Sequence, residues 1–183
     1  MIMYSGEKVI LRELRKSEME IAKQGINDKE VRYFLSDQIL PYKYEDEISW
    51  YDGVSGNNLK GYNFAIEDKE TGKYIGACGV NELKDIARVA TIGILIFDKK
   101  YWNRGYGTDA LNVLIDFLFN QVNMNKISLK VYSFNERAKA SYRKCGFVEE
   151  GVLRQEIYKN GRYYDEIYMG LLKEEYNSRK EKE

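Results

Sequence analysis

The order of apolar and polar positions predicts a chain of short strands with helices between them. Residues 62–67 and 74–80 alternate with a period of two on either side of a turn at 68–72, as antiparallel strands do. Asn160 and Gly161 give a strong hairpin signal before the last predicted strand. The remaining strands are predicted at 8–14, 89–97, 126–131, 147–153 and 163–171, which makes about seven strands in all.

Helical spacing of apolar residues predicts five helices between these strands. They cover 17–25, 28–35, a segment that begins near 44, a segment from the glycine loop at 105–107 to about 121, and 136–144. Ser17 followed by Glu20 has the form of a capping box at the start of the first helix. The only proline, Pro41, separates the second helix from the third.

Length and composition predict a single domain. The chain has 183 residues, and a hydrophobic content of 44% is enough to build a sizeable core. The polar stretch 53–61 has the character of a turn region, and the chain contains no interdomain linker. We expect one domain over 1–175 and a charged tail over 176–183 that frays.

The junction between the strand at 89–97 and the following helix is a candidate anion site. Gly105 and Gly107 stand where the helix begins, and a helix start carries unpaired N–H groups and the positive end of the helix dipole. A plain connection would use the same two glycines. The loop lacks the lysine of a Walker A motif and the third glycine of a dinucleotide-binding motif. Nucleotide hydrolysis and hydride transfer are therefore disfavoured.

Composition narrows the chemistry further. Lys plus Arg and Asp plus Glu both number 29, so no net field favours nucleic acid or an anionic membrane. The absence of histidine removes the commonest general base and metal ligand. Cys78 and Cys145 are too few for a four-thiolate zinc site, so no metal centre is expected. Met1 to Leu11 lack the apolar core of a signal peptide, and we expect a soluble, cytoplasmic protein.

Two motifs resemble those of the GNAT superfamily of N-acetyltransferases. Residues 102–107 resemble motif A, Gln/Arg-x-x-Gly-x-Gly/Ala, with Trp102 in place of the first Gln or Arg. Residues 135–147 are similar to motif B, Asn-x-x-Ala-x-x-x-Tyr-x-x-x-Gly-Phe, with every anchor present. The resemblance covers residues 8–172 and implies the α/β GNAT acyltransferase fold, a mixed, mostly antiparallel twisted sheet of about seven strands flanked by helices.

The resemblance implies acetyl-coenzyme A as co-substrate. Asn135 would contact the pantetheine arm, and Tyr142 would act as the general acid that protonates the departing sulfur. Taken without the family, Asn135 is explained as a helix N-cap and Tyr142 as a packed tyrosine. The coenzyme-binding residues implied by the resemblance are Leu95, Ile96, Phe97, Trp102, Asn103, Arg104, Gly105, Tyr106, Gly107, Thr108 and Asn135.

The acceptor side is less well defined by the sequence. Many relatives carry a glutamate base on the strand before motif A, but Thr91 stands at that place here. Glu82, Glu13 or a chain of waters are the alternatives for the base. Candidates for binding the acceptor are Glu13, Tyr33, Glu45 and Glu47. Taken without the family, acids in a first helical turn are explained by the helix dipole, and Tyr33 is explained by core packing.

These observations predict an N-acetyltransferase that transfers acetyl directly to a primary amine in a ternary complex. The Tyr101-Trp102 pair resembles the branch that acetylates ribosomal-protein N-termini and polyamines, so the acceptor is either a protein α-amine or a polyamine such as spermidine. The alternative is a non-catalytic acyl-coenzyme A sensor. A tyrosine-rich C-terminal hairpin would suit a homodimer interface. Cys145 as an acyl carrier is disfavoured, because it lies one helical turn beyond Tyr142, against the core.

Overall fold

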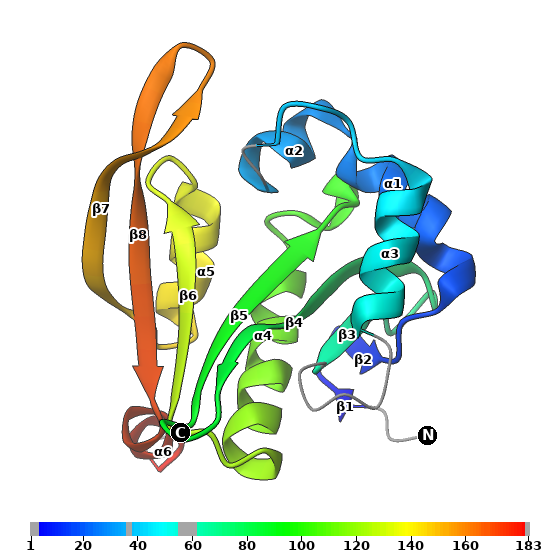
Figure 1. Cartoon of the computed structure of the whole chain (residues 1–183). Coiled ribbons are helices and arrows are strands. Elements are labelled where there is room, and N and C mark those ends of the chain that lie inside the picture. Colours follow the sequence, from blue (N-terminus) through cyan, green and yellow to red (C-terminus); the bar gives the residue numbers. More distant parts are fainter. Residues whose placement is uncertain (1–3, 36–37, 55–61, 182–183) are drawn as a thin grey trace.

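The chain folds around one eight-stranded sheet. The computed structural model describes residues 4–35, 38–54 and 62–181 (Figure 1). The strand order is β1-β2-β3-β4-β5-β6-β8-β7, and every neighbouring pair is antiparallel except β5 and β6. The strands are β1 (Tyr4–Ser5), β2 (Val9–Arg12), β3 (Asn63–Asp68), β4 (Tyr74–Lys84), β5 (Val89–Ile96), β6 (Lys126–Tyr132), β7 (Val148–Lys159) and β8 (Arg162–Leu172). The predicted mixed sheet is confirmed, and the additional strand is the two-residue β1.

Helices flank this sheet. A 3₁₀ turn at Lys16–Glu18 precedes the first helix, and a second one at Lys99–Tyr101 precedes the glycine loop. A π-helical segment, Phe117–Gln121, extends the fourth helix. The α-helices are α1 (Met19–Ile26), α2 (Lys29–Leu35), α3 (Tyr44–Val54), α4 (Tyr106–Asp116), α5 (Glu136–Lys144) and α6 (Lys173–Lys180).

Both faces of the sheet carry a hydrophobic core. Consecutive residues of a strand point to opposite faces, and the neighbours Ala65 and Ile66 are both fully buried but belong to different clusters. The larger cluster contains Ile66 and the apolar side of α4, including Leu111. The smaller cluster contains Ala65 and Ala22 of α1. The helix pair α1 and α3 therefore covers one face and α4 the other.

The only parallel pair among the described strands, β5 and β6, is very short. It joins Val89–Thr91 to Lys126–Ser128, three residues on each strand. Beyond Thr91, β5 pairs with β4 alone, and beyond Ser128, β6 pairs with β8 alone. Figure 1 shows the two strands diverging toward their carboxyl ends. We call this opening the fork; it leaves one edge of β5 and one edge of β6 without a strand partner.

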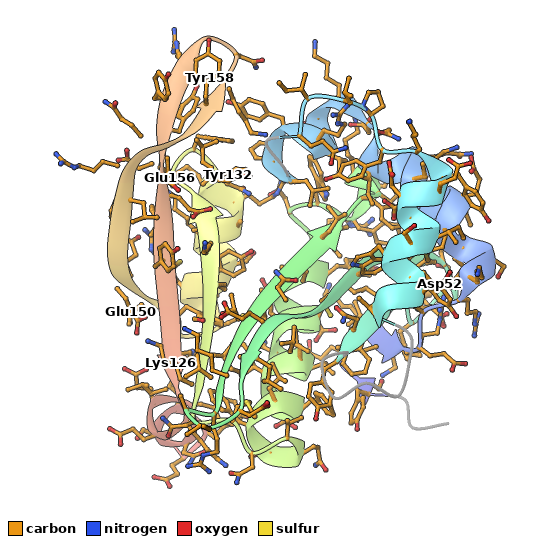
Figure 2. All side chains as sticks on the ribbon, viewed as in Figure 1. Asp52, Lys126, Tyr132, Glu150, Glu156 and Tyr158 are labelled. Atoms are coloured by element: carbon orange, nitrogen blue, oxygen red, sulfur yellow. The ribbon has the colours of Figure 1, made fainter. Side chains whose placement is uncertain are left out.

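The C-terminal hairpin extends past the end of β6. β7 runs to Lys159, six residues further than predicted, with a register shift between Leu153 and Ile157. Gln155 within that irregular segment has φ of 55°, and its N–H donates to the Asp165 carboxylate at 2.8 Å. Tyr158 lies near the tip of the hairpin (Figure 2).

Two local expectations differ from the structure. The capping box at Ser17 does not form, because the α-helix begins at Met19 and the Glu20 carboxylate instead pairs with Lys23 at 2.7 Å. The segment beyond Glu175, expected to fray, is helical to Lys180. There the Tyr176 hydroxyl donates to Asp116 at 2.6 Å, a contact between distant segments that the local charge pattern does not reveal. The predicted turn region at 53–61 lies outside the described residues from 55 onward.

The N-terminal segment is fastened to α4 by one carboxylate. The N–H groups of Glu7, Lys8 and Val9 donate to Asp109 at 3.1, 2.8 and 2.9 Å. Asp109 lies in the first turn of α4, about a hundred positions along the chain from its partners. This one side chain therefore fixes where β2 begins relative to α4.

We expect Asp109→Ala to lower the free energy of unfolding by about 2 kcal/mol, because three N–H groups lose a charged acceptor. Urea denaturation of the purified protein measures this change. Asp109→Asn keeps one acceptor oxygen and should lose less. A loss below about 0.5 kcal/mol for the alanine variant would mean that water satisfies these N–H groups equally well.

Candidate active site

A cavity of about 960 Å³ occupies the fork and passes to both faces of the sheet. Its walls include Thr108 and Tyr142 on the side of α4 and α5, and Val31 and Glu47 on the side of α1 and α3. The volume is in the range of pockets that hold small ligands. The separation of β5 from β6 therefore creates a passage through the sheet in which two molecules can meet.

The backbone of β5 presents hydrogen-bonding groups to the fork. The Phe97 N–H donates to Ile75 of the β4 side at 3.0 Å. Successive N–H groups of a strand point to opposite edges, so the N–H groups of Ile94 and Ile96 point toward the fork. Leu95, Ile96 and Phe97 all line the cavity. The donors available to a ligand are thus those of Ile94 and Ile96, whereas Phe97 uses its own within the sheet.

The glycine loop forms the predicted helix-start site. Gly105 is the N-cap of α4 with φ of 85°, a left-handed conformation that suits glycine. The first bond of the helix runs from the Asp109 N–H to the Gly105 carbonyl, so the N–H groups of residues 105–108 precede the intrahelical pattern. A Cβ on Gly107 would meet no atom within 4 Å. Asn103, Gly105, Gly107 and Thr108 line the cavity, which leaves room for a phosphate beside these donors.

Two members of the loop face elsewhere. The Tyr106 side chain is buried and donates its hydroxyl to Asp68 at 3.3 Å, and Tyr101 donates to the same carboxylate at 3.2 Å. Burial acts to raise the pKa of Asp68, but hydrogen bonds from Thr71 and these tyrosines hold it below its usual value. Arg104 is exposed and donates to the Lys100 carbonyl at 3.2 Å. The side chains of Tyr106 and Arg104 are therefore outside the cavity. Asp68 holds the loop in place through its hydrogen bonds with the two tyrosines.

Arg137 is a cavity residue that does not figure among the site residues predicted from sequence. Its guanidinium lies 3.5 Å from the ring centroid of Trp102 and 5.0 Å from that of Phe34. It forms no hydrogen bond with any residue in the described part of the chain, and burial lowers its pKa, against the attraction of Glu30. The signal was its position in motif B, two residues after Asn135. Arg137 brings a cation beside the loop position where Trp102 replaces Gln or Arg.

The anchors of motif B belong to α5 and the residue before it, on the same side of the cavity as the glycine loop. Asn135 accepts the Ala138 N–H at 3.2 Å as the N-cap of α5, and it also lines the cavity. Tyr142 is buried and lines the cavity, and its hydroxyl has no hydrogen-bond partner among the described residues. Burial, with a smaller effect of Cys145, raises the pKa of Tyr142 to about 12. The phenol is therefore protonated at neutral pH and faces the cavity.

Neither cysteine offers a thiolate. Burial raises the pKa of the Cys145 thiol to about 12, and its sulfur lies 3.8 Å from the Thr108 carbonyl. Cys78 lines the cavity, but burial raises the pKa of its thiol as well. An acyl-cysteine intermediate has no nucleophile here at neutral pH.

One of the predicted acceptor-binding acids lies in the cavity. Glu47 is buried at 5% exposure and lines it together with the neighbouring Asp46. Burial, and then the proximity of Asp46, raise the pKa of Glu47. Its sequence neighbour Glu45 is exposed and is not part of the wall. The cavity therefore carries two acidic side chains on its α3 side.

The other predicted acceptor residues and bases lie outside the cavity wall. Glu13 and Glu82 are exposed. Tyr33 packs on Phe34 and Phe134 with ring centroids 5.2 and 4.8 Å apart. Thr91 does line the cavity, and its hydroxyl is 3.1 Å from that of Ser128, its partner at the closed end of the fork. No carboxylate of this chain occupies the Thr91 position.

No group of three or more His, Cys, Asp or Glu residues in the described part of the chain could hold a metal ion. None of the described helices is long and apolar enough to cross a membrane.

Comparisons with known proteins agree with this geometry. The family model described as an acetyltransferase (GNAT) domain matches residues 8–148. The chain is 29% identical over 176 residues to spermidine N(1)-acetyltransferase of Vibrio cholerae, covering 96% of this chain and 99% of the relative. It is 32% identical over 109 residues to YdaF of Bacillus subtilis, named provisionally as a ribosomal N-acetyltransferase, covering 60% and 59% of the two chains.

A solved structure shares the fold over nearly the whole chain. The spermidine N-acetyltransferase from Vibrio cholerae in complex with CoA and spermine superposes with a TM-score of 0.82 at 28% identity, covering 93% of this chain and 98% of that one. The loop donors and the fork described above fit a coenzyme of this kind. The chain therefore belongs to the GNAT acetyltransferase family and is an acetyl-coenzyme A-dependent N-acetyltransferase.

Proposed function

We propose that this enzyme acetylates a primary amine of a small polyamine such as spermidine, by direct attack in a ternary complex. The observation that carries the proposal is Glu47, a buried carboxylate in the cavity wall with Asp46 beside it. A buried carboxylate needs a cationic partner, and a polyamine supplies a second ammonium group beyond the one that reacts. A peptide α-amine supplies only the amine that reacts, with no second ammonium group as part of the same acceptor. The similarity to spermidine acetyltransferases supports the same choice.

The coenzyme-binding part of the proposal uses the α4 side of the cavity. The N–H groups of residues 105–108 bind the pyrophosphate at the helix start, and Arg137 adds a cation nearby. The N–H groups of Ile94 and Ile96 and the Asn135 side chain bind the pantetheine arm in the fork. Acetyl-coenzyme A supplies an acetyl group activated as a thioester.

Tyr142 is the proposed general acid. The amine nitrogen bonds to the carbonyl carbon, the carbon–sulfur bond breaks, and the sulfur takes the hydroxyl proton of Tyr142. The amine gives up a proton to water, which returns one to the tyrosinate. Because the pKa of Tyr142 is raised to about 12, the phenol stays protonated at neutral pH and can donate its proton when the sulfur departs.

Thiol release from acetyl-coenzyme A, with spermidine or a short peptide as acceptor, tests the function. We expect release with spermidine. Glu47→Gln should raise the KM for spermidine about tenfold or more, because a charge-assisted contact is lost. Glu45→Gln is the control, because Glu45 lies in the same helix two residues before Glu47 but is exposed. Release with peptides alone would overturn the polyamine proposal.

A pH series adds an independent check on Glu47. Burial and Asp46 raise the pKa of its carboxyl, so the group becomes neutral at a higher pH than an ordinary glutamate. The KM for spermidine in the parent should therefore rise as the pH falls through that pKa. The Glu47→Gln variant should lack this rise.

We expect Gly107→Val to raise the KM for acetyl-coenzyme A at least tenfold, because the new side chain fills the space beside the helix-start donors. The KM for the amine should change little. Gly53→Val in α3 is a matched control, since a Cβ there also meets no atom within 4 Å and Gly53 is not part of the cavity wall. An unchanged coenzyme KM with Gly107→Val would contradict the assignment.

We expect Tyr142→Phe to lower kcat about 10²- to 10³-fold, with coenzyme affinity unchanged, because the sulfur loses its proton donor. Steady-state kinetics and a binding titration with coenzyme A measure the two quantities. Tyr158→Phe at the hairpin tip serves as the control. A parent-like rate would remove Tyr142 from the mechanism.

A further inference from the structure

Two asparagine side chains lie over a pair of glycines in the centre of the sheet. Gly79 of β4 and Gly93 of β5 are directly paired. A Cβ built on Gly79 would lie 2.2 Å from the side-chain oxygen of Asn63, and one built on Gly93 would lie 2.8 Å from the side-chain nitrogen of Asn81. Both amides therefore occupy space that any other residue would fill at these two positions. We call Asn63, Gly79, Asn81 and Gly93 the amide floor.

A β-bulge brings Asn81 into this arrangement. Val80 pairs with Ile92 and Glu82 pairs with Thr91, so Asn81 is the extra residue of β4. Bulges change the direction of side chains and occur often beside active sites. Asn81 and Glu82 are both exposed, but Asn81 lies over Gly93 in the cavity wall and Glu82, the next residue, is not part of that wall. The bulge thus places an amide in the cavity wall and the carboxylate outside it.

The amide floor has unused hydrogen-bonding capacity. Asn63, Asn81, Gly79 and Gly93 all line the cavity. Neither asparagine side chain forms a hydrogen bond with another residue in the ranges 4–35, 38–54 and 62–181. The adjacent Thr91 hydroxyl has Ser128 within 3.1 Å. Two amides without a hydrogen-bond partner among the described residues, on a sheet face that is otherwise largely apolar, point to a ligand that carries N–H groups.

We propose that Asn63 and Asn81 bind and orient the reacting amine of the acceptor, at the place where Thr91 supplies no carboxylate. This inference rests on the proposed amine acetylation. An amide oxygen accepts an amine N–H and directs the nitrogen lone pair without adding a charge. A carboxylate in contact would stabilise the ammonium form and raise the pKa of the amine. The neutral floor orients the nucleophile without this stabilisation of the unreactive form, and Glu47 in the same cavity binds the distant ammonium.

The test is calorimetric binding of spermidine, and separately of a short peptide with a free α-amine, to the full chain saturated with coenzyme A. We expect Asn63→Ala and Asn81→Ala each to weaken spermidine binding about tenfold, with coenzyme affinity unchanged. Asn81→Ala removes an exposed side chain without partners among the described residues, so the fold should persist. Glu82→Gln, on the other residue of the bulge, is the matched control and should bind like the parent.

The outcomes separate this inference from the proposed function. Parent-like binding by both asparagine variants, with spermidine still acetylated, overturns the amide floor and leaves the polyamine function intact. Weakened binding of the peptide, with no acetylation of spermidine by the parent, supports the floor and rejects the polyamine acceptor. If neither amine binds the parent protein, the floor is rejected. A Glu82→Gln variant that weakens binding as much as Asn81→Ala assigns the role to the carboxylate instead.

Discussion

The structure depends on the early end of the pairing between β5 and β6. Three residues on each strand are joined, and every later residue of the two strands faces the fork on one edge. A sheet normally satisfies backbone groups with the next strand, and an unpaired edge inside a fold needs another partner. The N–H groups of Ile94 and Ile96 have no acceptor among the described residues, so water or a ligand can serve as that partner. The cavity is therefore built into the sheet itself, and it does not require a separate domain or lid.

Groups that suit anions and groups that suit cations lie on different sides of the fork. Helix-start N–H groups and Arg137 make the α4 and α5 side suited to anions, while Glu47 and Asp46 make the α3 side suited to cations. The thioester would stand between them, close to a phenol and two neutral amides. In the proposed mechanism a chain without histidine uses Tyr142 as the proton donor and leaves removal of the amine proton to water. In the proposed ternary complex, separation of the two charged regions would also keep the coenzyme phosphates and a polyamine from pairing with each other.

Local signals predicted the parts of the site that follow from local structure. The strand, glycine loop and helix around Gly105 form as expected, because a helix start and a left-handed glycine are properties of a few adjacent residues. Asn135 is the N-cap of α5, as its place before a helix predicts, and it also lines the cavity, so the proposed contact with the coenzyme remains a prediction. Glu47 could be distinguished from Glu45 only in three dimensions, since both lie in the first turn of α3.

Other parts depend on contacts that no local pattern contains. Glu82 was a candidate base by position in the strand, but the bulge at Asn81 changes what β4 presents to the cavity. The pairing of Trp102 with Arg137 joins two motifs that lie far apart in sequence. The helix beyond Glu175 is held by contacts with distant segments, such as that of Tyr176 with Asp116 and that of Arg179 with the Lys144 carbonyl, whereas the charge pattern of the tail alone suggests fraying. In each case a tertiary contact overrides a local preference.

The anchor at Asp109 connects the docking of the N-terminal segment with the charge at the start of α4. This carboxylate lies in the first turn of α4, near the place proposed for the pyrophosphate, where a bare negative charge would repel the ligand. Three N–H groups of residues 7–9 surround its oxygens and reduce that repulsion. If the N-terminal strand detaches, the helix start becomes more negative even though α4 itself is unchanged. Coenzyme binding and docking of the first strands would then favour each other. Removal of the N-terminal residues would lower the affinity for the coenzyme even though those residues do not contact it.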